Sequence, residues 1–91
     1  MDHKEILKEA AALLSDRGQD YGALELNFDR IRTVAGVLLN REVTRYEVAA
    51  ILFATKIGRL GEKRKHDSFV DGVNYLAFMG QFAEDDDVQR P

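Results

Sequence analysis

Residues 44–59, TRYEVAAILFATKIGR, decide the fold because they specify a long helix at the centre of the protein. Thr44 and Glu47 have the spacing of a capping box, in which Thr44 caps the helix and Glu47 bonds back to the Thr44 amide. Residues 48–54 that follow are all apolar. A helix that is apolar on nearly every side is central, either in a bundle or in a subunit interface. We expect this helix to end at Gly61.

Two further helices are predicted upstream, because apolar residues recur there at helical spacing. The first covers residues 2–14 and the second residues 24–39. A loop, residues 15–22, separates them, since two glycines with Ser and Asp break the pattern. Asn40 is the predicted stop of the second helix, because Asn tolerates the left-handed conformation that ends helices.

A fourth helix is predicted downstream, beginning near Asp67 or Ser68 and ending near Phe82. Short connections between helices favour antiparallel neighbours. The sequence therefore predicts an all-α, four-helix bundle with no strands. We expect residues 1–83 to form this single helical domain and residues 84–91 to form an acidic C-terminal tail.

The composition limits both size and function. The 91 residues suffice for one small domain. The apolar fraction of 45% and the charged fraction of 32% are typical of a globular protein. A net charge of -3 argues against a nucleic-acid or membrane partner. Cysteine is absent, and neither a membrane-spanning run nor a signal peptide is found, so we expect a cytoplasmic protein.

Two adjoining segments contain the strongest candidate for a functional site. One predicted helix closes with two cations, and the next opens with two acids four residues apart. Residues at i and i+4 share a helix face, so the acids and a following tyrosine form one stripe. Acids beside core residues are costly to bury without a ligand, metal or cation. The candidate residues are Lys56, Arg59, Asp67, Asp71, Asn74 and Tyr75.

Each of these residues also has a structural explanation. Asp67 could cap the fourth helix or favour its first turn through the helix dipole. Lys56 could extend past the core into water, or pair with Asp71 instead of binding phosphate. Arg59 lies near a helix end, where a cation is favourable. These alternatives are open, and an acid–cation network could also be structural while lining a pocket.

Four other features could contribute to a site. Glu47 is an acid, although the capping box alone explains it. Tyr21, between two glycines, could stack on a base or cover the core. His3 and His66 lack metal-ligand spacing and are interpreted as surface residues. The basic residues 63–66 form a solvated turn, or contact phosphates next to Asp67.

The chain resembles a small phage-encoded helical domain of unknown function. More distantly, it resembles the MazG-like all-α nucleotide pyrophosphohydrolases and the nucleotide-modification-associated domains of phages. The resemblance covers residues 17–83. The matching positions are Arg17 with Tyr21-Gly22, Asn27-Phe28, residues 44–48, Lys56-Ile57-Gly58-Arg59, Asp67, Asp71 and Asn74-Tyr75.

The resemblance implies nucleotide binding, with Mg²⁺-dependent hydrolysis of a nucleoside triphosphate in the enzymatic version. Mg²⁺ would then be held by Asp67, Asp71 and Glu47. Phosphate charge would be neutralised by Lys56 and Arg59, while Asn74 and Tyr75 orient the sugar or base. The acid cluster that such enzymes place on the preceding helix is largely missing here.

Other functions are therefore also expected. A non-catalytic nucleotide sponge would keep the pocket without the metal cluster. A helical adaptor would instead bind a host protein. In each case we expect a homo-oligomer with the third or fourth predicted helix at its interface, located in the host cytoplasm if the protein is phage-encoded.

Overall fold

The computed structural model describes residues 1–16 and 21–87, and these residues form four helices and no strand. The helices are α1 (His3–Asp16), α2 (Tyr21–Leu39), α3 (Arg45–Arg59) and α4 (His66–Asp87). The all-α prediction is confirmed. The ends of the predicted loop, residues 15–16 and 21–22, are helical instead, and its middle, residues 17–20, lies outside the described residues.

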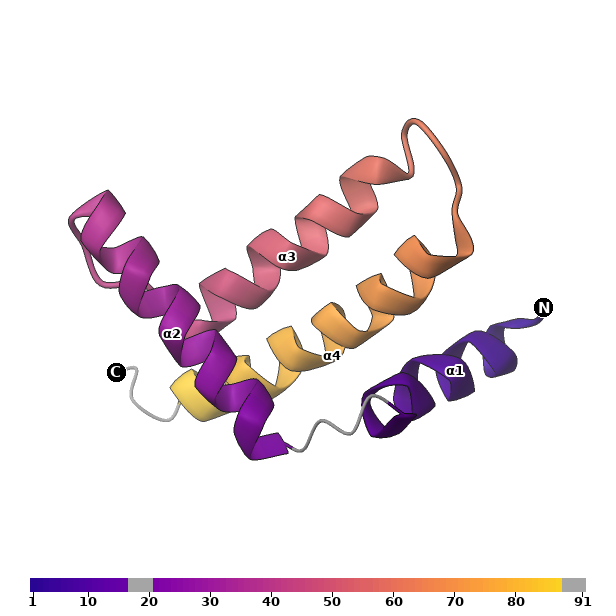
Figure 1. The fold of residues 1–91 in the computed structure, drawn as a ribbon, viewed down its shortest axis with the longest axis horizontal. Coiled ribbons are helices and arrows are strands. Elements are labelled where there is room, and N and C mark those ends of the chain that lie inside the picture. The colour runs from indigo at the N-terminus through magenta and orange to yellow at the C-terminus, as the bar shows by residue number, and fades with distance from the viewer. Residues whose placement is uncertain (17–20, 88–91) are drawn as a thin grey trace.

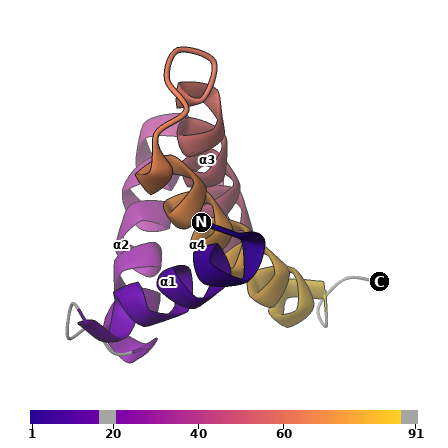
Figure 2. The same cartoon turned by 90° about the vertical axis from the view of Figure 1, so that its right-hand side faces the viewer.

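Helices α3 and α4 form an antiparallel pair, which is joined by the connection that rises above the rest of the chain (Figure 1). The two helices approach closely at Gly72, where an added Cβ would lie 3.3 Å from Ile57 Cδ1. Helix α1 packs along α4, and α2 crosses the end of the pair where α3 begins (Figures 1 and 2). Helix α2 therefore does not cover the other end of the pair, at which the connection joins α3 to α4.

The hydrophobic core lies where α2 crosses the pair. Its buried members include Phe28, Val48 and Phe82, with Phe78 packed against them. The Phe28 ring lies 5.2 Å from Phe78 and 5.0 Å from Phe82, measured between centroids. Aromatic pairs at this separation contribute about 0.5–1.5 kcal/mol beyond their buried area. This cluster fixes α2 on the α3–α4 pair.

The turn between α2 and α3 is built as the sequence predicted. Asn40 has a φ of 55°, and the Arg41 amide donates to the Gly36 carbonyl at 3.1 Å. This left-handed helix end leaves little room at Gly36, where a Cβ would lie 3.0 Å from the Arg41 carbonyl oxygen. The capping box of Thr44 and Glu47 then starts α3, with both reciprocal hydrogen bonds present.

Two helices differ from the prediction, α3 in how much of its surface is exposed and α4 in its length. Within residues 48–54, Val48 and Ala49 are buried but Ile51 is 60% exposed, so α3 is not enclosed on all sides. Helix α4 continues beyond Phe82 to Asp87 and includes the first acids of the predicted tail. In the described part of the chain, none of the helices is long and apolar enough to cross a membrane.

Candidate functional site

A charged pocket of about 530 Å³ lies where α3 ends and α4 begins. Seven of its eight lining residues carry a charge, four positive and three negative, so the pocket is net positive by one charge in a chain whose net charge is -3. The remaining residue, Ser68, is buried. The lining residues are Lys56, Arg59, Glu62, Lys63, Lys65, Asp67, Ser68 and Asp71.

Two lining residues of this pocket, Lys56 and Asp71, form an ion pair. The Lys56 ammonium lies 2.9 Å from Asp71 Oδ2, and the two side chains are 22% and 25% exposed. The pair joins the last turns of α3 to the first turns of α4 within one chain. The predicted pairing of Lys56 with an acid of the fourth helix is therefore confirmed.

The other cations of the pocket have no acidic partner among the described residues. Within residues 1–16 and 21–87, no ion pair is formed by Arg59, Lys63 or Lys65. Arg59 belongs to the last turn of α3, and the two lysines belong to the connection. The pocket thus contains one neutralised cation and three that can bind an anion.

The start of α4 differs from the predicted cap. The helix begins at His66, so Asp67 and Ser68 lie inside its first turn instead of capping it. The Ser68 amide bonds to the Lys65 carbonyl at 3.1 Å. Asp67 lines the pocket and forms no ion pair with any described residue. The positive end of the helix dipole lies next to this carboxylate.

Asn74 and Tyr75 are not brought to the pocket. The Asn74 amide donates a hydrogen bond of 2.9 Å to the Ala10 carbonyl and so connects α4 to α1. Tyr75 is half-buried and does not contribute to the pocket lining. The expectation that these residues orient a sugar or base thus lacks support in their positions, because Asn74 faces the neighbouring helix.

Glu47 is also separated from the other two acids. It lies nine residues before Lys56 on α3, which corresponds to about 13 Å along the helix axis. Its carboxylate accepts hydrogen bonds from the Thr44 amide at 3.0 Å and from Arg41 Nη2 at 3.0 Å. The Arg41 bond, followed by the Thr44 amide, lowers the pKa of Glu47 from its ordinary value of 4.5.

The three acids expected to bind metal therefore do not meet in one chain. Asp67 and Asp71 share the pocket, whereas Glu47 is committed to a cap and an arginine. Across residues 1–16 and 21–87, no three Asp, Glu or His side chains are close enough to hold a metal ion together.

The remaining candidate residues lie at the surface or have side chains outside the described residues. His66 Nε2 lies 2.6 Å from Glu9 Oε2, with both side chains partly exposed, and this contact connects the start of α4 to α1. His3 is exposed at the start of α1, as predicted for a surface residue. The backbone of Tyr21 begins α2, but its side chain lies outside the described residues, as does Arg17.

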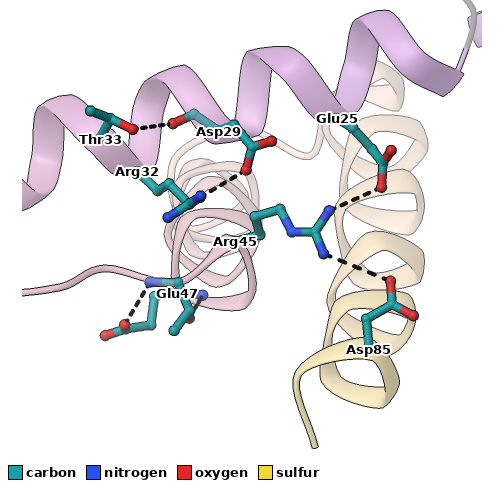
Figure 3. Close-up of polar contacts among 8 residues, drawn as sticks. Glu25, Asp29, Arg32, Thr33, Arg45, Glu47 and Asp85 are labelled. Carbon is teal, nitrogen blue, oxygen red and sulfur yellow. Dashed lines mark hydrogen bonds and ion pairs between the residues drawn. The ribbon is translucent and has the colours of Figure 1, made fainter. Parts of the chain in front are cut away.

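Arg45 is an interaction centre that the sequence did not reveal. It bonds to Glu25 of α2 at 2.9 Å and reaches Asp85 of α4 at 4.0 Å (Figure 3). Its guanidinium also lies 4.8 Å from the centre of the Phe82 ring. These contacts connect three helices at the end of the bundle opposite the pocket. No local pattern could indicate them, since the partners are 20 and 40 positions away.

Comparison with known proteins gives a family. No curated protein and no solved structure is significantly similar to this chain. The family described as Domain of unknown function (DUF6378) matches residues 5–83, which include α3, the connection and most of α4. This match extends over far more than half of the sequence, so the chain belongs to the DUF6378 family.

Proposed function

We propose that this protein binds a nucleotide, and that the pocket between α3 and α4 holds the phosphates of this ligand. The observation that carries the proposal is the charge of the pocket. Three cations without an ion-pair partner in the described chain converge there, although the chain as a whole is acidic. Their natural partner is an anion with several charges.

The pocket fits such a ligand in size and chemistry. Its volume of about 530 Å³ is suited to a small molecule. Arg59 offers a planar guanidinium that can bind phosphate oxygens in pairs, and Lys63 and Lys65 add compact charges. Asp67 and Ser68 of the first turn of α4 line the same pocket, so the positive end of this helix dipole lies beside it, which favours phosphate. Carboxylates such as Glu62 can accept hydrogen bonds from ribose hydroxyls.

The donor set fits Mg²⁺ poorly. Protein Mg²⁺ sites use one or two carboxylates together with substrate phosphates. Asp71 is already paired with Lys56, and the other two carboxylates of the pocket, Asp67 and Glu62, are not part of any group of three possible metal ligands among the described residues. We therefore favour the sponge-like alternative, in which the nucleotide is bound without hydrolysis. The resemblance to MazG-like and phage proteins supports a nucleotide as the ligand class.

Calorimetric titration with ATP, in the presence and absence of Mg²⁺, tests this proposal. Arg59→Gln should weaken binding about 10- to 100-fold, because a hydrogen bond to a charged group contributes about 1.5–3 kcal/mol. Arg30→Gln removes the same charge from the surface of α2 and should leave the affinity unchanged. Absence of binding at millimolar ATP, or equal affinity of Arg59→Gln, would contradict the proposal.

Comparison of the titrations with and without Mg²⁺ separates binding from catalysis. Binding that does not need Mg²⁺, without pyrophosphate release, is expected for a sponge. Pyrophosphate release that requires Mg²⁺ and is lost in Asp67→Asn would instead establish the pyrophosphohydrolase. A matched Asp2→Asn variant, which removes an acid from the chain start, controls for the change in net charge.

Self-association is a second property that we propose, and its support comes from α2. This helix exposes six aliphatic residues, with exposed fractions between 37% for Ile31 and 78% for Leu38. Part of this surface is a shallow apolar pocket of about 410 Å³ that α2 alone lines. No described helix covers it. The residues are Leu26, Ile31, Val34, Val37, Leu38 and Leu39.

A second copy of the chain is the occupant that we propose for this surface. A stable interface removes about 800 Å² per partner, which is about an eighth of the chain's 6673 Å² of accessible surface. The segment from Leu26 to Leu39 is about 20 Å long, so two α2 helices packed against each other through the apolar pocket of Ile31, Val34 and Leu38 would supply most of the apolar centre. The interface that we propose lies on α2, whereas the sequence analysis expected it on the third or fourth helix. A monomer in light scattering would contradict it and favour a host-protein adaptor.

A further inference from the structure

We infer that the pocket recognises the phosphate chain of its ligand and is indifferent to the base. The ligand class would then be nucleoside triphosphates in general, together with inorganic triphosphate. This inference rests on the proposed nucleotide binding and specifies which part of the nucleotide is recognised.

Among its described lining residues, the pocket has neither an aromatic ring nor a side-chain amide. A base is commonly held by stacking on an aromatic face, and its edge is bound by an amide, by Arg or Lys, or by a carboxylate. In this pocket Arg59, Lys63 and Lys65 are the groups that the proposal assigns to the phosphates. Of the eight described lining residues, seven are charged and the eighth is the buried Ser68. A base held at this pocket would therefore face solvent or charged groups.

The described amide and aromatic residues that could bind a base do not line the pocket. The Asn74 amide is occupied by the Ala10 carbonyl at 2.9 Å. Phe69 is 40% exposed and Tyr75 is half-buried, but neither lines the pocket. Helix α2, which contains Asn27, crosses the opposite end of the α3–α4 pair (Figures 1 and 2).

The arrangement of the cations matches a chain of phosphates better than a single one. Lys56 is neutralised by Asp71, while Arg59, Lys63 and Lys65 follow one another from the end of α3 into the connection. A phosphate monoester carries only about 1.5 to 2 negative charges at neutral pH. Each further phosphoryl group adds charge and oxygen atoms, so a triphosphate can engage all three cations at once.

The carboxylates of the pocket strengthen this preference. Glu62, Asp67 and Asp71 reduce the pocket to one net positive charge. A small anion such as inorganic phosphate is attracted only weakly by that net charge. An extended chain gains by contacting several cations separately, while its oxygens stay away from the carboxylates. Affinity should therefore increase with the number of phosphates.

A calorimetric series with the full chain tests the inference, at about 0.15 M salt so that exposed charges are screened. The ligands are ATP, GTP, CTP, UTP, ADP, AMP, adenosine and inorganic triphosphate. We expect the four triphosphates to agree within about threefold and inorganic triphosphate to bind within about tenfold of them, a difference that one weak contact would explain. Affinity should fall from ATP to ADP to AMP, and adenosine should not bind.

Arg59→Gln makes the test specific to the pocket. It should weaken all four nucleoside triphosphates and inorganic triphosphate by the same factor, whereas Arg30→Gln should weaken none. A preference for one base above about tenfold, or adenosine binding as tightly as ATP, would overturn the inference while leaving nucleotide binding intact. If none of the ligands binds, both the inference and the proposed function fail.

Discussion

Replacement of Asp71 by Asn should destabilise the protein, because it leaves the Lys56 ammonium without its partner. At a distance of 2.9 Å the attraction is about 6 kcal/mol for an effective dielectric constant of about 20. Desolvation offsets much of this attraction. Exposed pairs contribute about 0–1 kcal/mol and breaking a buried pair costs about 3–5 kcal/mol. Since about three quarters of each side chain is covered, we expect a loss of about 2 kcal/mol.

Thermal unfolding followed by circular dichroism measures this loss. For a domain of this size, 2 kcal/mol corresponds to a decrease in Tm of roughly 8–16 °C. Asp67→Asn is the matched control, because it removes the same charge one turn earlier on α4. Asp67 forms no ion pair in the described chain, so its replacement should cost only the dipole contribution of about 0.3–1 kcal/mol.

A double-mutant cycle with Lys56→Met separates the pair from effects of each residue. Lys56→Met keeps the aliphatic stem, so the double variant should be more stable than the sum of the single losses predicts, by about 1 kcal/mol or more. Equal Tm values for wild type and Asp71→Asn, or a coupling energy of zero, would refute the reasoning and show that the pair is solvated.

Three further results are expected. Glu47→Gln should lower Tm at neutral pH. Because the pKa of Glu47 is lowered in the folded protein, its stabilising contribution is complete above about pH 4.5 and is lost as the pH falls through the folded-state pKa, so the difference in Tm from wild type should shrink there. Glu42→Gln, in the adjoining turn, should show no such pH dependence. Arg45→Met should lower the free energy of unfolding in urea by about 1–2 kcal/mol, because it removes a partly buried bond to Glu25. Arg32→Met, which breaks an ion pair within one helix turn, should lower it by at most about 0.5 kcal/mol. Equal losses would argue against Arg45 as an interaction centre. Leu38→Glu should reduce the mass observed in light scattering while Ile51→Glu should not, and the reverse result would move the interface from α2 to α3.

Local sequence patterns predicted the parts of the fold that depend on a few neighbouring residues. The capping box of Thr44 and Glu47 and the left-handed Asn40 both formed as expected. The pairing of Lys56 with Asp71 was also predictable, because it spans a single helix–turn–helix unit whose two helices must lie side by side.

The features that were missed depend on contacts between distant parts of the chain. Helix α4 continues to Asp87 although acids at a helix C-terminus oppose the dipole. Arg45 supplies a nearby positive charge at Asp85, which no pattern around residue 85 indicates. Likewise, the bond from Asn74 to Ala10 depends on the docking of α1 and could not be read from the fourth helix alone.

The candidate site was predicted in part for the same reason. Residues 56–71 were expected to gather acids and cations, and six of the seven charged lining residues of the pocket were singled out beforehand, Glu62 being the exception. Glu47 was grouped with Asp67 and Asp71 through the family resemblance. The length of α3 separates them, because its capping acid and its last cations lie at opposite ends of the helix.

Amide NMR spectra of the isotope-labelled protein, recorded during titration with ATP, test the central claim most directly because they locate the ligand. If the pocket binds the phosphates, the largest chemical-shift changes should fall on residues 59–71, which include the last residue of α3, the connection and the first turns of α4. The amides of Val34 and Val37 on α2 should remain unchanged. Saturable changes centred on α2, or none at millimolar ATP, would contradict a phosphate-binding pocket between α3 and α4.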